Sequence, residues 1–236
     1  MRFFLFACFM NLAAIAAEPS VQLNEVRAVL EDAIKTFRTE GPKGWSFTQT
    51  TRGDGHSRVE RYDATQTEFN RWALLQQDDR EPTADELRDY HEKLSRRSRG
   101  GTAPRLTDQL DLTTLELAND SPERATLRFR LKPGEAGDGT GEHLAANLIL
   151  HKPSRTIESF ELGAVEPFSP MIGIKISAMK TVMTYSLPDE TRPSLLQTST
   201  THLRGRAYFF KSLDADMTVT FTDYESVRRG PKSPSK

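Results

Sequence analysis

The feature that most constrains this chain is a period-two alternation of apolar and polar residues from about residue 107 onward. In the run ERATLRFRL, Leu127, Phe129 and Leu131 alternate with Arg128 and Arg130, and the run DMTVTFTDY near the C-terminus shows the same pattern. Successive side chains of a strand point to opposite faces, so each run has one dry and one wet face. That pattern is typical of antiparallel sheets, and recurring turn residues between the runs predict a meander.

Two segments have helical spacing instead. In residues 21–39, apolar residues recur every three or four positions, and Gly41 and Pro42 follow at the predicted end. In the second segment, 83–97, Thr83 and Glu86 form a capping-box signature. Its apolar line is short, so this helix is predicted to lie as a flap at the surface.

The segment between the helices predicts a hairpin. Residues 44–51 alternate, RGDGH at 52–56 supplies the reversal as a loop of several residues, and SRVERYD returns. The run RWALLQQDD predicts a further short strand that ends in a polar turn. RGD at 52–54 is also an adhesion tripeptide, but a turn explains it more simply.

The N-terminus predicts an export signal over residues 1–17. One cation, Arg2, precedes an apolar run and small residues, with cleavage before Ala17 or Glu18; an uncleaved anchor or a buried helix is the alternative. The one cysteine, Cys8, lies inside this segment, so the mature chain would have no thiol for a disulfide, a zinc site or a nucleophile. The predicted location is therefore periplasmic or secreted, in a bacterium.

The charge and hydropathy of the chain limit the kinds of partner that it is predicted to have. The net charge of −1 does not favour nucleic acid, and no later segment is long and apolar enough to predict a transmembrane span. The basic tail 228–236 is predicted to be disordered. With no repeat and no long linker, residues 18–227 are predicted to form a single domain.

Two short stretches carry a family resemblance. Phe47-Thr48-Gln49 directly after a helix, and an aromatic strand around Trp72, resemble the periplasmic carriers of outer-membrane lipoproteins and their relatives. The run RWALLQQDDREPTADELRDY resembles a recurring signature of uncharacterised exported proteobacterial proteins. The first resemblance implies a strongly curved sheet that forms an incomplete barrel, helices over its open side, and a cavity for acyl chains.

The predicted fold class is accordingly α+β: a strongly curved antiparallel sheet, covered by the N-terminal helix, with the second amphipathic helix as a flap. Large apolar residues on the strands are either sealed core or the wall of a cavity, and both interpretations are open. The candidate wall residues are Trp45, Phe47, Trp72, Phe129, Phe160, Phe168, Met171 and Phe221.

The segment EPFSPMIGIKI is predicted to be a loop, since two prolines and Gly173 interrupt any regular strand. Its apolar residues Phe168, Met171 and Ile172 either tuck beneath the loop or form a lip for a hydrophobic ligand or a membrane. Near the second helix, four arginines form a basic patch, which is either a solvated helix end or a contact for phosphate headgroups or an acidic partner. These residues are Arg96, Arg97, Arg99 and Arg105.

The sequence lacks the nucleophile-elbow, zincin and P-loop motifs. It has no GxSxG or HExxH pattern, its five histidines are scattered, and its glycine-rich 134–141 stretch lacks the Lys-Ser/Thr ending of a P-loop. We therefore predict a non-enzyme without cofactor or metal that binds or carries a hydrophobic or acyl-bearing envelope molecule. The alternative is an envelope protein that binds another protein, and a hydrolase with a dispersed site is a third class.

Overall fold

The structure is a computed structural model that describes residues 19–37, 44–97, 109–132, 140–208 and 210–227. The predicted signal 1–17, the predicted tail 228–236, and Arg99 and Arg105 lie outside these residues. The side chains of Arg96 and Arg97 also lie outside the part that the structure describes.

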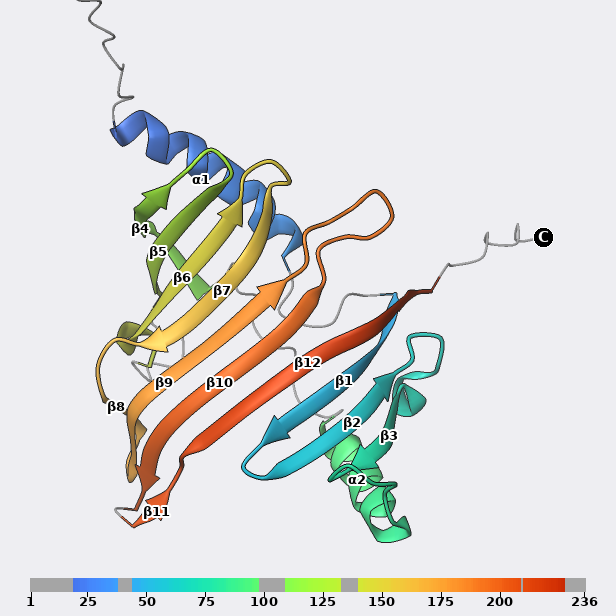
Figure 1. The fold of residues 1–236 in the computed structure, drawn as a ribbon. Coiled ribbons are helices and arrows are strands. Elements are labelled where there is room, and N and C mark those ends of the chain that lie inside the picture. Colours follow the sequence, from blue (N-terminus) through green and yellow to red (C-terminus); the bar gives the residue numbers. More distant parts are fainter. Residues whose placement is uncertain (1–18, 38–43, 98–108, 133–139, 209, 228–236) are drawn as a thin grey trace, which may run out of the picture.

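Twelve strands of the described residues form one sheet (Figure 1). The strands are β1 (Trp45–Gly53), β2 (His56–Tyr62), β3 (Trp72–Gln77), β4 (Leu110–Asp120), β5 (Arg124–Leu131), β6 (Leu144–His151), β7 (Thr156–Ala164), β8 (Phe168–Met171), β9 (Ile174–Tyr185), β10 (Leu196–Ala207), β11 (Lys211–Ser212) and β12 (Ala215–Ser226). The helices are α1 (Pro19–Thr36) and α2 (Ala84–Arg97), with short 3₁₀ helices at Glu68–Asn70 and Thr140–His143.

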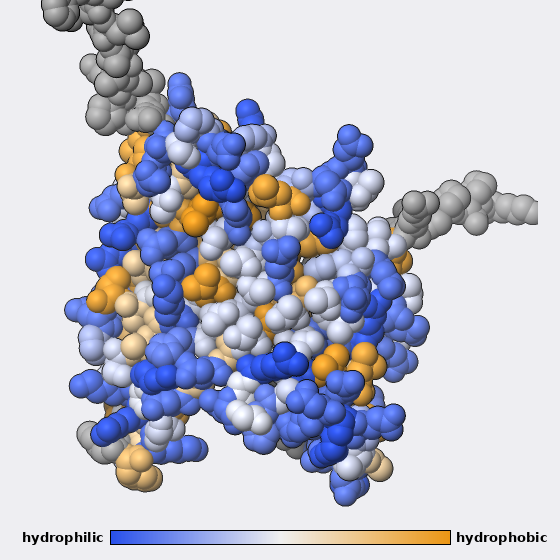
Figure 2. Space-filling view, viewed as in Figure 1, coloured by the Kyte–Doolittle hydropathy of each residue, from blue (hydrophilic) through white to orange (hydrophobic). Residues whose placement is uncertain are grey.

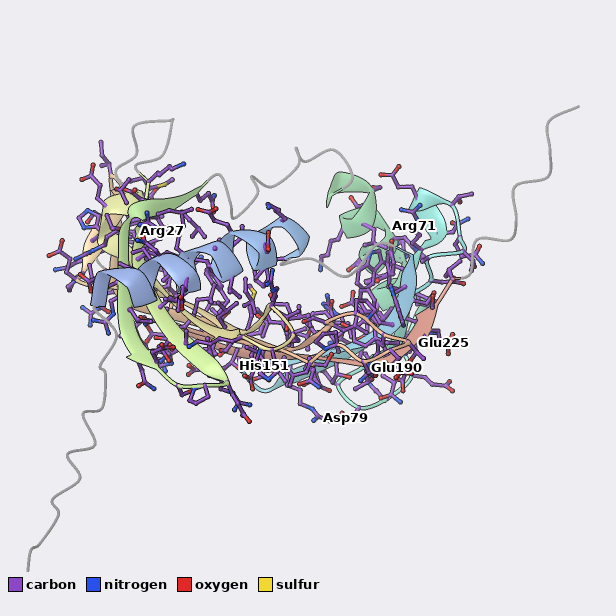
Figure 3. All side chains as sticks on the ribbon, turned by 90° about the horizontal axis from the view of Figure 1, so that it is seen from above. Arg27, Arg71, Asp79, His151, Glu190 and Glu225 are labelled. Carbon is purple, nitrogen blue, oxygen red and sulfur yellow. The ribbon has the colours of Figure 1, made fainter. Side chains whose placement is uncertain are left out.

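The sheet is antiparallel and open. Its order is β3-β2-β1-β12-β10-β9-β7-β6-β5-β4, with β11 added to β10 and β8 added to β9. Since β3 and β4 end the order without pairing with each other, the sheet does not close. Viewed from above it bends into a deep curve, with α1 inside one arm and α2 inside the other (Figure 3). The prediction of an α+β fold with an antiparallel sheet is confirmed, and the open curve is consistent with an incomplete barrel.

The alternation read from the sequence separates the two faces of the sheet. In β5, Leu127 and Phe129 are buried while Arg128 and Arg130 are exposed. The convex face carries ion pairs such as Lys180 with Glu161, and Figure 2 shows this face largely hydrophilic. The concave face takes the apolar side chains, as expected for a sheet with one solvated side.

Helix α1 closes one arm of the curve. Its residues Val26, Leu30, Ala33 and Ile34 are buried in a cluster with side chains from β4 to β10. Burying a Leu or Val side chain contributes about 1.5–3 kcal/mol, so this stripe holds the helix on the sheet. The helix runs three residues short of its predicted end at 39, and residues 38–43 lie outside the description.

Helix α2 begins with the capping box read from the sequence. The backbone N–H of Glu86 donates to Thr83 Oγ1 at 3.3 Å, and the N–H of Thr83 donates to Glu86 Oε2 at 2.8 Å. Tyr90 is buried, and Leu87 and Leu94 are half-buried. The helix lies on the concave side, near β2 and β3 (Figure 3). Its apolar side chains are turned toward the rest of the protein, where Tyr90 lies beside Leu74 of β3.

Two local predictions need correction. The β1–β2 hairpin has a two-residue turn, Asp54-Gly55, instead of a loop of several residues, because both residues adopt the positive φ that a tight hairpin turn requires. The predicted loop at EPFSPMIGIKI contains the short strand β8. Phe168 pairs with Ile176 and Met171 with Ile174, so the interrupted edge strand tolerates Pro170.

Candidate ligand-binding face

The middle of the concave face is lined by half-buried side chains from four adjacent strands. Antiparallel partners share a face, and Ser199 of β10 pairs with Val219 of β12 and Met183 of β9. Thr201, two residues on, pairs with Met217 and Thr181 in the same way. We call this set the central strip. Its members are Gln49, Thr51, Met179, Thr181, Met183, Ser199, Thr201, Leu203, Met217, Val219 and Phe221.

The central strip combines apolar side chains with threonine hydroxyls that are already paired. The hydroxyls of Thr181 in β9 and Thr201 in β10 are hydrogen-bonded to each other, with 3.1 Å between their oxygens. Met217 is 39% exposed, and most other members are half-buried. Methionine side chains adapt to irregular apolar shapes. The strip can therefore accept an apolar group with little loss of hydrogen bonding.

The α1 side of the strip is a sealed core. Phe129 is 1% exposed and Phe160 is 3% exposed, and both lie in the cluster beneath α1. Phe37, just after the helix, places its ring 6.0 Å from that of Phe160 and 5.0 Å from that of Tyr185. Of the predicted wall residues, Phe129 and Phe160 thus belong to packed interior in this structure.

The α2 side carries an aromatic cluster centred on Phe47. Its ring stacks on Tyr62 at 5.0 Å and meets Trp72 edge-on at 5.7 Å. Phe221 and Tyr224 of β12 lie 5.7 and 5.6 Å away. The structure therefore brings three predicted wall residues together, Phe47, Trp72 and Phe221; Phe47 is itself buried at 3% exposure, and the other two are half-buried. Trp45 joins at the margin, where its ring contacts Tyr224 at 6.4 Å.

A hollow of about 350 Å³ opens beside this cluster, under α2. It is lined by Gln49, Glu60, Tyr62, Glu68, Arg71, Trp72 and Leu94. Glu60 is only 5% exposed, and its Oε2 accepts a hydrogen bond from Gln49 Nε2 at 3.3 Å. The hollow thus offers aromatic walls with a carboxylate, an amide and, from Arg71, a guanidinium.

Sequence reasoning did not single out Glu60 or Arg71. The signal for Glu60 was present, because the alternation in HSRVERY puts Glu60 on the same face as Tyr62. A charged residue at an inward position of a strand is a candidate for function, since burying a charge is costly without partners.

A second hollow of about 270 Å³ continues the central strip toward the β1–β2 turn. Thr51, Thr201, Leu203 and Met217 contribute to its lining. Since Thr51, Thr201 and Met217 are also in the central strip, strip and hollow form one continuous surface. Its other lining residues are Gly53, Asp54, His56, Ser57, Arg58, Gln77 and Ala215.

The remaining predicted wall residues lie elsewhere. Phe168 is buried in a separate small cluster with Leu144 and Ile176, and its ring stacks on His143 at 5.3 Å. Met171 is 62% exposed at the end of β8. Of the two alternatives for this segment, Phe168 tucks in, whereas Met171 and Ile172 point outward, Ile172 being 100% exposed.

Two tyrosines near the strip are neutral hydrogen-bond donors. Burial raises the pKa of both Tyr185 and Tyr224 well above the ordinary tyrosine value. Tyr224 donates its hydroxyl to the carbonyl of Leu196 at 2.6 Å. Among the described residues, no cluster of three or more His, Cys, Asp or Glu side chains could hold a metal ion, and no helix is long and apolar enough to cross a membrane.

No protein-family model, curated protein or solved structure matches this chain.

Proposed function

We propose that this protein is an exported, non-catalytic binder of a hydrophobic or acyl-bearing envelope molecule, which it holds along the central strip. The observation that carries the proposal is the contrast along the concave face. The α1 arm is sealed by a packed helix, whereas the adjoining strip of Met, Val, Phe and Thr side chains stays partly open.

The energetics favour an alkyl chain as the bound group. Removing a methylene group from water contributes about 0.8 kcal/mol, so a chain of several methylenes outweighs the ordering cost of binding. Because the hydroxyls of Thr181 and Thr201 are hydrogen-bonded to each other, covering them with a ligand costs little hydrogen-bonding free energy.

The hollow under α2 suits the polar end of such a ligand. Its Glu60 carboxylate and Gln49 amide lie beside the aromatic rings of Tyr62 and Trp72. A mainly apolar site with a few placed polar groups is the usual composition of a small-molecule pocket. Export is supported by the residue pattern of 1–17 and by the resemblance to periplasmic lipoprotein carriers.

The test begins with the protein purified from periplasm, analysed by native mass spectrometry and by solvent extraction. A copurifying lipid or fatty acid supports the proposal. An empty protein that captures one fixed partner protein would contradict it and favour the alternative of a protein-binding envelope component.

A matched pair of variants locates the site. Thr201→Trp fills the central strip, whereas Thr200→Trp adds the same ring one residue away on the convex face, where Thr200 is exposed. With a dansyl-labelled fatty acid as probe, Thr201→Trp is expected to weaken binding at least tenfold and Thr200→Trp to leave it unchanged. Equal effects of the two variants, with matching circular dichroism spectra, would place binding elsewhere.

A further inference from the structure

Four exposed apolar side chains gather at one end of the sheet, where the β8–β9 turn lies beside the β10–β11 turn. Ile172 is 100% exposed, Phe210 is 87%, Tyr208 is 65% and Met171 is 62%. We call these four the tip patch. Elsewhere in the described residues the exposed large apolar side chains are 38–48% exposed and lie on other elements. Figure 2 shows hydrophobic atoms at this corner, at the lower left over β11.

The two turns are joined by a hydrogen bond. Met171 pairs with Ile174, and Gly173 completes the turn with a φ of +84°. The N–H of Tyr208 donates to the carbonyl of Gly173 at 2.6 Å. The Tyr208 ring lies so close to Gly173 that an added Cβ would meet Cε1 at 3.0 Å. The tip patch is therefore displayed on two turns that support each other.

Cations flank the tip patch. Arg206 pairs across the strands with Lys175, and Ala207 pairs with Lys211. All three cationic side chains are exposed, and no ion pair of the described residues involves them. Lys175 and Arg206 also line an open hollow of about 530 Å³ together with Ser177, Arg204, Gly205, Ser212 and Asp214.

The acidic groups nearby are engaged by other donors. Asp214 accepts the N–H of Gly205 at 3.1 Å. Asp216 binds Arg204 Nη2 at 2.6 Å and also contacts His202. A backbone hydrogen bond leaves the negative charge of Asp214 in place, so Asp214 offsets part of the charge of Lys175, Arg206 and Lys211, and the surface beside the tip patch keeps a smaller excess of positive charge.

We propose that this end of the sheet docks on a membrane surface that contains anionic lipids. Ile172 and Phe210 would enter the boundary between headgroups and acyl chains, while Lys175, Arg206 and Lys211 contact lipid phosphates. Exposed apolar groups combined with flanking cations are the features that bind proteins to anionic bilayers. Side chains on turns need no shaped partner surface, because lipids rearrange around them. This proposal is independent of the ligand proposed for the central strip.

The test is vesicle flotation of the purified protein. Binding is expected to vesicles of phosphatidylcholine with phosphatidylglycerol, to weaken with salt, and to be weaker to phosphatidylcholine alone. Ile172→Ser with Phe210→Ser is expected to lower the partition coefficient by about tenfold or more. The matched control, Leu75→Ser with Val165→Ser, removes two exposed apolar side chains elsewhere and should bind like the wild type.

Charge and insertion are tested separately. Lys175→Glu with Lys211→Glu should remove the preference for phosphatidylglycerol, whereas Lys93→Glu on α2 should not. Ile172→Trp should show a blue-shifted fluorescence emission when phosphatidylglycerol vesicles are added, and Leu75→Trp should not. Equal flotation of the tip variant and its control would overturn the proposal. The proposal would also be overturned if the wild-type protein did not bind these vesicles, or if it self-associated in solution through the tip patch.

Discussion

Gln49 Nε2 lies 3.3 Å from Glu60 Oε2 on the concave face, which gives a carboxylate that is almost fully buried an amide donor from the neighbouring strand. The two residues are direct partners in the β1–β2 pairing. A buried carboxylate needs such donors, because an unsatisfied one loses its solvation without compensation.

Replacing Gln49 by Leu is expected to lower the free energy of unfolding by about 1–3 kcal/mol, since Glu60 would remain buried without this donor. Glu60→Leu in the Gln49→Leu background should recover part of that loss. Urea unfolding of the two single variants and the double variant measures the coupling. Additive effects would show that the two side chains do not interact, and Thr50→Leu on the opposite face serves as control.

The packing of α1 on the sheet gives a second prediction. Leu30 is 0% exposed within the main core, and Leu30→Ala is expected to cost about 2–5 kcal/mol of stability through lost burial and a residual cavity. Leu75 is 46% exposed, so Leu75→Ala should change stability by less than about 0.5 kcal/mol. Denaturant unfolding compares them, and similar midpoints would mean that α1 is not packed as described.

Glycines in the strands supply a third comparison. A Cβ on Gly205 would lie 2.7 Å from the carbonyl oxygen of Lys175, whereas a Cβ on Gly163 would meet its nearest neighbour, the carbonyl oxygen of Met179, at 3.5 Å. Gly205→Ala is therefore expected to destabilise the protein by about 1–3 kcal/mol. Gly163→Ala should be neutral or slightly stabilising, because alanine restricts the unfolded chain. Thermal unfolding tests the difference, and a neutral Gly205→Ala would refute the close approach.

The start of α2 predicts a pH dependence. Hydrogen bonds from the Arg80 guanidinium, with further donors from Thr83, lower the pKa of Glu86 to about 2 from its ordinary 4.5. The stabilisation is therefore present above pH 4.5 and is lost as the pH falls toward 2. Glu86→Gln and Arg80→Ala should both show a shallower loss of stability across this window than the wild type. Denaturant titrations at several pH values measure the slope, and unchanged slopes would contradict the assignment.

The sequence by itself determined the local structure of this protein. The alternation around Leu127 and Arg128 set a strand with one buried and one exposed face, and Thr83 with Glu86 marked the start of α2. Asp54-Gly55 specified a reversal. These features depend on backbone geometry and on residues a few positions apart, which is why a single sequence reveals them.

Only the tertiary structure decided which apolar side chains are sealed. Phe129 and Phe160 look no different in sequence from Phe221, yet α1 covers the first two, while Phe221 is only partly buried. The alternation placed Glu60 on the inward face, but only the tertiary structure brought Leu94 of α2 to the same hollow. The bending of the sheet and the placement of two helices arise from contacts between distant segments. An alternating pattern says which face is apolar, but it does not say what covers that face.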